Sequence, residues 1–471
     1  MTLPDPSQPL PKRIFIDATY TLASGKSSGI ERVVRSVTRE CQRMAKQGQI
    51  PDVRQVISHG GRFYEVGPAE IDRYRNTAAM HRNVLSCASP VYRRAAKALC
   101  STLPLPKLRK WFLPQPGHLG VFKVAHSIRE AWVHRQVART CTPVSPTSQD
   151  IFLLPDAYWV NRLRNTIWPA ATHARHCGAK VASVMYDLIP ITHPEFVGRE
   201  RSEAFLEYVK SVASHSDMVV AISQTVREQV DQLLAELPQP PSGYCRDIRS
   251  FDLGCELKPT QGEVRPQVSQ AFAGVPPYLM VATFDPRKNH EFLLDAFDEM
   301  WQTGDSFRLC LVGRFGAQCD RTVARIQQHP QLGEKLLLFN DLSDAELQYC
   351  YRHARAVIFP SIVEGFGLPI VESLWFGKKT FASDTQIHRE VGQSDCSYFS
   401  LDSTSQLIDS IRNWEQQTTP EEVSGSGRQL TTWRESANQI VHHCLSLFAD
   451  RVATNPSSAD TICFPADREA A

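Results

Sequence analysis

The sequence lacks several features that would define its class at once. No apolar run approaches the roughly 20 residues of a membrane-spanning helix, and the N-terminal stretch MTLPDPSQPLPKR has no signal-peptide core. The 13 cysteines are an odd number and include no C-x-x-C pair, which argues against zinc and dithiol motifs. We therefore expect reduced thiols and a cytoplasmic protein without a zinc site.

The length of 471 residues exceeds what one hydrophobic core usually serves, so we expect two domains. Alternating predicted strands and helices indicate an α/β fold with doubly wound parallel sheets. Ser223 and the Ser343–Glu346 pair have the character of helix N-caps. The polar, proline-bearing stretch 256–277 is typical of a linker and would separate an N-terminal domain at 1–255 from a C-terminal domain at 278–430.

The stretch from Arg355 to Asp384 predicts a strand, a glycine-broken loop, a short helix and a second strand. Gly365 and Gly367 allow the backbone to turn tightly and to approach a ligand closely. Pro369 suits the first turn of a helix, where its missing N–H costs nothing. The helix would thus begin beyond the carboxyl end of a parallel strand, an arrangement that favours phosphate binding.

Two carboxylates, Glu364 and Glu372, flank this loop. Neither is suited to phosphate, but both can accept hydrogen bonds from hydroxyl groups. A molecule with phosphates in its middle and hydroxyls at both ends is a nucleotide sugar. The alternative is an ordinary strand–helix turn with a solvated glutamate.

The string EGFGLPIVE, preceded by Pro360 and Ser361, resembles the E-x7-E signature of retaining family 4 glycosyltransferases of the GT-B fold. The resemblance implies two Rossmann-like domains that face a cleft. It also implies that Glu364 contacts the hydroxyls of the donor sugar and Glu372 the ribose. The other donor-binding residues that it implies are Ser361, Gly365, Phe366, Gly367, Leu368 and Pro369.

A second donor segment, Asp285-Pro-Arg-Lys-Asn-His, follows a predicted strand at Tyr278–Thr283. By the same resemblance Lys288 binds the donor phosphate, with Arg287 beside it. Many family members carry an arginine where this chain has Thr283, and Arg314 is the candidate replacement. The alternative is a surface pair that caps a helix.

The acceptor side is expected in the N-terminal domain. Gly29 lies in a string similar to the family's D-A-x…G-I-x-R-[YV] start, which implies a close backbone approach rather than a plain turn. Asp156 ends a predicted strand, and Asp187 ends the next, in a segment similar to H-D-L-x-P with Tyr186 replacing the usual His. Asp187 is thus an acceptor-positioning candidate, and His193 is either a second one or a structural loop residue.

An insertion at about 65–148 fits this pattern poorly. Within it, residues 91–140 contain ten basic residues and a single acidic one, Glu130, a net charge of +9 in a chain whose total is +2. Basic residues interleaved with aromatic ones suit an anionic membrane surface. The alternatives are a solvated insertion and nucleic-acid binding, but no nucleic-acid module is recognisable and we expect no nucleic-acid partner.

The resemblance also implies that a helix at 431–450 crosses back to the first domain, and we expect residues 451–471 to form a mobile tail. The strings FDPRKN and YDLIP look most like bacterial mannosyl- or rhamnosyltransferases of surface polysaccharide synthesis. The expected reaction transfers a hexose to a hydroxyl of a glycan or of a lipid-linked acceptor, with retention of configuration. GDP-mannose is the expected donor.

The chain has no D-x-D motif, so we expect neither a metal nor another cofactor. The resemblance implies that the leaving phosphate accepts the proton of the acceptor hydroxyl. It also implies that the catalytic residues are Glu364, Lys288 and Asp187. Two alternatives remain open: a sugar-nucleotide epimerase of the same fold, and a non-catalytic scaffold that binds nucleotide sugars at a membrane.

Overall fold

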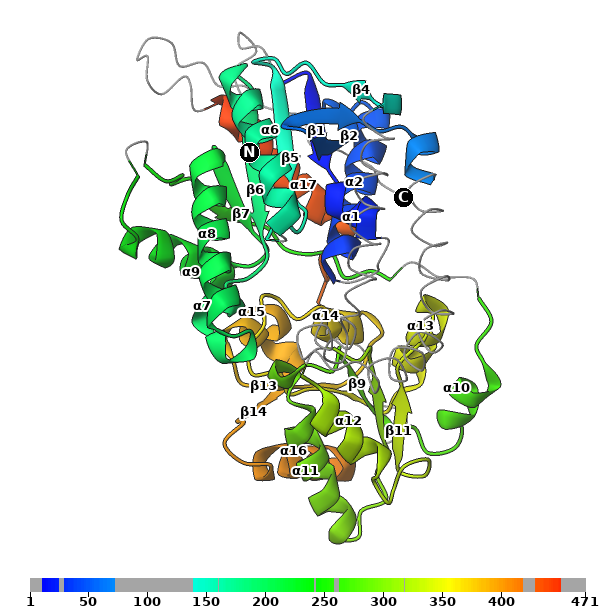
Figure 1. The fold of residues 1–471 in the computed structure, drawn as a ribbon. Coiled ribbons are helices and arrows are strands. Elements are labelled where there is room, and N and C mark those ends of the chain that lie inside the picture. The colour runs from blue at the N-terminus through cyan, green and yellow to red at the C-terminus, as the bar shows by residue number, and fades with distance from the viewer. Residues whose placement is uncertain are drawn as a thin grey trace, which may run out of the picture.

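The computed structural model describes residues 11–24, 29–72, 139–159, 161–240, 243–257, 262–316, 318–417 and 428–449. These residues form two α/β domains, each built on one sheet and stacked one above the other (Figure 1). Almost all of the basic segment 91–140 lies outside the described residues, as does the tail 451–471. None of the described helices is both long and apolar enough to cross a lipid bilayer.

The N-terminal domain contains an eight-stranded sheet in the order β4-β3-β2-β1-β5-β6-β7-β8. The six strands from β2 to β8 run parallel, and β3 and β4 add an antiparallel edge. The interior strands are continuous apolar runs, as expected where helices cover both faces. The strands are β1 Arg13–Asp17, β2 Asp52–His59, β3 Arg62–Glu65, β4 Thr142–Pro143, β5 Asp150–Leu154, β6 Lys180–Met185, β7 Met218–Ala221 and β8 Ile248–Ser250.

Alternate side chains of this sheet enter two separate cores. Ile14 and Ile16 pack on one face with α2 (Gly29–Lys46), whereas Phe15 packs on the other face with α6, α8 and α9. This alternation follows from the period of two in a β-strand. The remaining helices of the domain are α1 Thr19–Ser24, α6 Asn161–His176, α7 Ile189–Thr192, η1 Pro194–Phe196, α8 Arg199–His215 and α9 Gln224–Glu236.

The C-terminal domain contains a six-stranded, fully parallel sheet in the order β11-β10-β9-β12-β13-β14. Successive strands join the sheet in one direction from β9 to β11 and in the other from β12 to β14, so the strand order reverses between the neighbours β9 and β12. Ligands of such sheets bind at this point, beyond the carboxyl ends of the strands. The strands are β9 Tyr278–Val281, β10 Leu309–Val312, β11 Leu336–Phe339, β12 Val357–Phe359, β13 Thr380–Ser383 and β14 Cys396–Phe399.

Helices cover both faces of this second sheet, and a short one, α10, lies within the stretch 256–277 that the sequence suggested as a linker. The helices are α10 Pro266–Ala271, η2 Pro286–Lys288, α11 His290–Gln302, α12 Asp320–Gln327, α13 Asp344–His353, α14 Leu368–Trp375, α15 Gln386–Gly392, η3 Gln393–Asp395 and α16 Ser405–Gln417.

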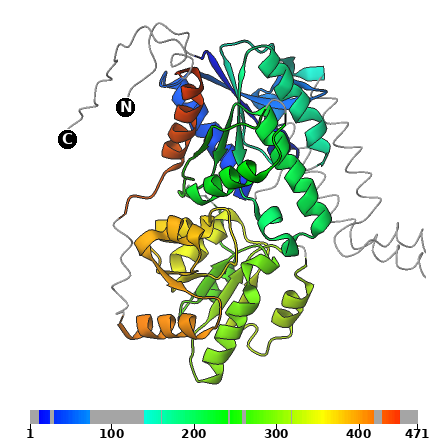
Figure 2. The same ribbon diagram turned by 90° about the vertical axis from the view of Figure 1, so that its left-hand side faces the viewer.

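The last helix, α17 (Trp433–Ala449), lies on the N-terminal domain beside α2 (Figures 1 and 2). Its apolar face, including Ala437 and Val441, shares a core with Val33 and Val37 of α2. The chain therefore crosses between the domains twice.

The amino end of α9 also joins the two domains. Glu390 of α15 accepts hydrogen bonds from the backbone amides of Gln224 and Thr225, at 2.7 and 2.8 Å. A carboxylate at a helix N-terminus is favourable because it satisfies unpaired amides and faces the positive end of the helix dipole. The second domain thus caps a helix of the first.

Two carboxylates are fully buried, Asp17 at the end of β1 and Asp156 just beyond β5. Asp17 accepts a hydrogen bond from the Tyr158 hydroxyl at 2.7 Å, and Asp156 accepts one from the Thr21 amide at 2.7 Å. Burial raises the pKa of Asp17 to about 6 and, together with the nearby Asp17 charge, raises the pKa of Asp156 to about 7.

These pKa values make the stability of the N-terminal domain depend on pH. At these two carboxyls the folded protein binds more protons than the unfolded chain between about pH 4, the ordinary range of an aspartate, and pH 7. The contribution of the two carboxyls to stability therefore falls as pH rises through this window. Relative to wild type, we expect Asp156→Asn to have a higher urea midpoint at about pH 8 than at about pH 5, because the variant lacks the carboxyl that must ionise in the folded state.

The exposed Asp231 of α9 offers a matched control, since Asp231→Asn removes a carboxylate that is not buried. This variant should keep the wild-type pH dependence. The same dependence in Asp156→Asn would contradict the assignment of a raised pKa to Asp156.

Candidate functional site

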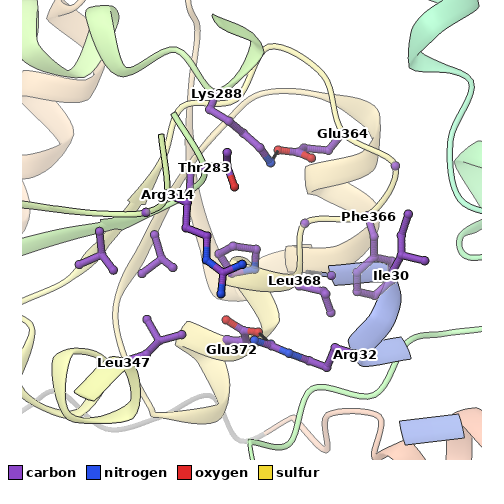
Figure 3. A pocket seen from close by; sticks show the side chains of 18 of the residues that line it. Ile30, Arg32, Thr283, Lys288, Arg314, Leu347, Glu364, Phe366, Leu368 and Glu372 are labelled. Carbon is purple, nitrogen blue, oxygen red and sulfur yellow. Dashed lines mark hydrogen bonds and ion pairs between the residues drawn. The ribbon is translucent and has the colours of Figure 1, made fainter. Parts of the chain in front are cut away.

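A cavity of about 490 Å³ lies between the two domains, within the size range of small-molecule sites. Its walls come from the carboxyl-end loops of both sheets, and Figure 3 shows side chains converging on it. The N-terminal domain supplies residues that include Gly29, Arg32 and Asp187. The C-terminal domain supplies Thr283, Arg287, Lys288, Arg314 and the segment from Glu364 to Pro369, together with Glu372.

The loop between β12 and α14 has the geometry that its glycines suggested. Gly367 has a φ of 110°, a left-handed conformation that favours glycine, and it is the N-cap of α14. Pro369 lies in the first turn, and no side chain caps this helix end. The first turn of α14 therefore lines the cavity, and no side chain caps its backbone amides. These amides are suited to bind a phosphate.

Gly365 lies where the loop touches the N-terminal domain. A Cβ atom added there would lie 2.2 Å from the carbonyl oxygen of Tyr186 and 2.9 Å from Cβ of Asp187. The hydroxyl of Ser223 donates a hydrogen bond of 3.0 Å to the Gly365 carbonyl. The absence of a side chain at Gly365 thus allows the two domains to come together at the cavity.

Glu364 is almost completely buried and forms an ion pair with Lys288 (Figure 3). It forms a second one with Arg287, whose Nη1 lies 2.9 Å from Oε2. Burial alone raises the pKa of this carboxyl, but the two cations outweigh burial and lower the pKa to about 2. Burial lowers the pKa of Lys288 despite its partner. Glu364 is therefore ionised at any physiological pH.

Glu372 is also buried, and its two oxygens have different partners. Oε2 accepts a hydrogen bond of 2.7 Å from the hydroxyl of Tyr351 in α13, and Oε1 is paired with Arg32 of α2. The sequence pattern identified Glu372 but neither partner. The signal available for Arg32 was its place as the arginine of the G-I-x-R string that begins at Gly29, to which the sequence analysis gave no role.

Arg314 follows β10 and lines the same cavity. Within the described residues its exposed guanidinium has no hydrogen bond or ion pair, so it is available to an anionic ligand. Thr283 lines the cavity too, but Ser361 does not. Ser361 is buried beneath the loop, where its carbonyl accepts a 2.5 Å hydrogen bond from Ser383.

The four acceptor-side candidates divide into two groups. Gly29 and Asp187 line the cavity, and burial raises the pKa of Asp187 although Arg287 opposes the shift. Asp156 and His193 are not among the cavity's lining residues. Asp156 belongs to the buried network described above, and the His193 ring stacks on Phe196.

Comparison with known proteins agrees with this architecture. Residues 265–430 match the family described as glycosyl transferases group 1. The serotype-specific mannosyltransferase WbdA of Escherichia coli is 31% identical over 283 residues, which are 57% of this chain and 34% of WbdA. The O-antigen chain mannosyltransferase B of Escherichia coli is 23% identical over 287 residues, 59% of this chain and 66% of that protein.

The solved structures show the same fold. Sucrose-phosphate synthase from Thermosynechococcus elongatus superposes with a TM-score of 0.51 and 15% identity, covering 94% of this chain and 98% of its own. Two Rossmann-like domains with the cavity between them define the GT-B class. The match to the glycosyl transferases group 1 family covers residues 265–430, which include most of the C-terminal domain. The chain matches about a third of the length of WbdA.

The close approach at Gly365 can be tested directly. Gly365→Ala places a carbon 2.2 Å from a backbone oxygen of the other domain, so the loop or the domain must move. We expect this variant to keep the domains further apart, which small-angle X-ray scattering would detect as a larger radius of gyration.

Gly29→Ala is the matched control, because its Cβ would lie 3.6 Å from Leu368, an ordinary van der Waals contact. This variant should keep the wild-type radius, and circular dichroism should report folded protein in both. A wild-type radius for Gly365→Ala would mean that the domains do not close this far in solution.

Proposed function

We propose that the protein is a retaining mannosyltransferase. It transfers a hexose from a nucleoside diphosphate sugar, of which GDP-mannose is the preferred candidate, to a hydroxyl of a surface-polysaccharide acceptor. The observation that carries the proposal is the pairing of two buried carboxylates with cations in one interdomain cavity. The mannosyltransferase names of WbdA and the O-antigen enzyme support the choice of sugar.

The positive groups of the cavity would stabilise the departing diphosphate. Lys288, Arg287 and the exposed Arg314 line it together with the amino end of α14. Negative charge grows on the leaving group in the transition state, and fixed positive groups in a site with little water stabilise that charge most effectively. The bound diphosphate would share Lys288 and Arg287 with Glu364.

Glu364 would hold the sugar. With a pKa of about 2 it remains a hydrogen-bond acceptor for the sugar hydroxyls, rather than a proton donor. We propose that Asp187, which faces the cavity from the acceptor domain, orients the incoming hydroxyl. The leaving phosphate takes the hydroxyl proton, so no separate carboxylate base is required.

We also propose that the reaction needs no metal ion. The sequence contains no D-x-D motif, and Arg32, Arg287, Lys288 and Arg314 already bring four positive side chains to the cavity. Chelation of divalent cations should therefore leave the rate unchanged.

The function is tested with purified protein and a panel of GDP-, UDP-, dTDP- and ADP-sugars. The rate of transfer from GDP-mannose to a mannosyl acceptor should fall by about a hundred-fold or more in Glu364→Gln. The amide does not form ion pairs with the two cations, and it is a weaker acceptor of hydrogen bonds from the sugar hydroxyls than the carboxylate. Glu334→Gln, on an exposed turn, should be as active as wild type.

Three outcomes would count against the proposal. Transfer by Glu364→Gln at the wild-type rate would contradict the site. Release of an epimer without acceptor would identify an epimerase, and donor binding without any turnover would identify a scaffold.

A lipid-linked acceptor would bring the protein to the cytoplasmic face of a membrane. We propose that the basic, aromatic-rich residues 91–140 provide this contact, since their net charge of +9 favours an anionic surface. The full chain should co-sediment with vesicles that contain anionic lipid and be released by salt. Equal binding to neutral vesicles would contradict the electrostatic proposal.

A further inference from the structure

The contact between Arg32 and Glu372 crosses the cavity from one domain to the other. Arg32 lies in the first turn of α2 in the N-terminal domain, and Glu372 lies in α14 of the donor domain, 340 positions later. Figure 3 shows the Arg32 guanidinium reaching Glu372 from the side opposite Arg314. The Arg32 side chain is 31% exposed and that of Glu372 is 4% exposed.

Glu372 is held from both domains at once. Tyr351, from its own domain, donates to Oε2, and Arg32 pairs with Oε1. A buried carboxylate that loses its cation pays the cost of its lost hydration without compensation. The orientation of Glu372 therefore depends on the position of the N-terminal domain.

Other features of Arg32 indicate a role in the cavity rather than in packing. The Glu372 carboxylate raises the pKa of Arg32, with burial opposing the shift and the neighbouring Asp344 supporting it. Within the part of the chain that the structure describes, Glu372 is the one hydrogen-bond partner of the Arg32 guanidinium. A guanidinium has five N–H donors, so Arg32 can hold Glu372 and still donate to a ligand in the cavity.

We propose that Arg32 is a donor-site residue supplied by the N-terminal domain, which positions Glu372 for the hydroxyls of a nucleoside diphosphate and so couples nucleotide binding to domain closure. The inference rests on the proposed function, because it takes the bound molecule to be a nucleotide sugar. Arg32 is a positioning residue, since it acts through Glu372. The same arginine partly offsets the absence of an arginine at Thr283, because it brings a cation to the cavity from the other domain.

The test measures GDP binding by calorimetry, with UDP as the second probe, in wild type, Arg32→Ala and Arg32→Lys. The dissociation constant should rise about thirty-fold or more in Arg32→Ala, as for loss of one partner of a buried charge pair. The dissociation constant of Arg32→Lys should lie between those of wild type and Arg32→Ala. Lysine keeps the positive charge but lacks the planar guanidinium that donates two parallel hydrogen bonds. The donor KM should rise more than kcat falls.

Two further measurements separate this role from a structural one. Addition of GDP should reduce the radius of gyration of wild type but not of Arg32→Ala. In a double-mutant cycle, Arg32→Ala should have little further effect on GDP affinity once Glu372 is changed to Gln, because the two residues act together. Lys46→Ala removes an exposed cation from the same helix and should match wild type in each measurement.

The outcomes are distinct. If wild type binds GDP or UDP and transfers sugar, while Arg32→Ala binds and compacts as wild type does, this inference is overturned and the proposed function stands. Additive effects of the Arg32 and Glu372 changes would also overturn it. If wild type binds neither nucleotide and transfers no sugar, the proposed function fails, and this inference fails with it.

Discussion

The cavity depends on the buried ion cluster of Glu364, Lys288 and Arg287. Burial disfavours the charged form of all three side chains, yet the two cations lower the pKa of Glu364 to about 2. Such clusters usually contribute little net stability, because the hydration that the ions lose offsets their attraction. Their value here is that charge and hydrogen-bonding capacity are held in place before a ligand arrives, which is the arrangement that favours electrostatic stabilisation of a transition state.

Sheet topology explains why these residues meet. β9 and β12 are neighbours at the point where strand order reverses, so the loops that follow them lie side by side. One loop carries Arg287 and Lys288, and the other carries Glu364. The backbone reinforces this pairing, since the amide of Ile362 donates a 2.8 Å hydrogen bond to the Arg287 carbonyl. The fold thus builds the donor half of the cavity from segments that are about 76 positions apart in the chain.

Local patterns in the sequence were enough to predict the fold class, the glycine loop, the Ser223 and Ser343 helix caps and the pair of carboxylates. The contacts between domains were not predictable in this way. Ser223 shows the difference: its capping of α9 follows from its neighbours, whereas its hydrogen bond to the Gly365 carbonyl requires knowledge of how two domains dock. Arg32 and Tyr351 were missed for the same reason. Both Asp187 and Asp156 follow a strand, and this position alone did not show that Asp187 lines the cavity whereas Asp156 is fully buried and does not.

Each half of the cavity is therefore incomplete without the other domain. Glu372 needs Arg32, the Gly365 loop rests against Tyr186 and Ser223, and Glu390 caps α9. Opening the cleft would expose several of these polar groups together, and each would exchange its partner for water. Exposed hydrogen bonds and ion pairs have net values near zero to 1 kcal/mol, so such an exchange costs little in water. The two domains also share an apolar cluster, in which Ile222 and Leu253 belong to the first domain and Phe366 and Ile387 to the second. The cost of opening the cleft therefore comes mainly from this apolar contact, because the polar groups exchange their partners for water.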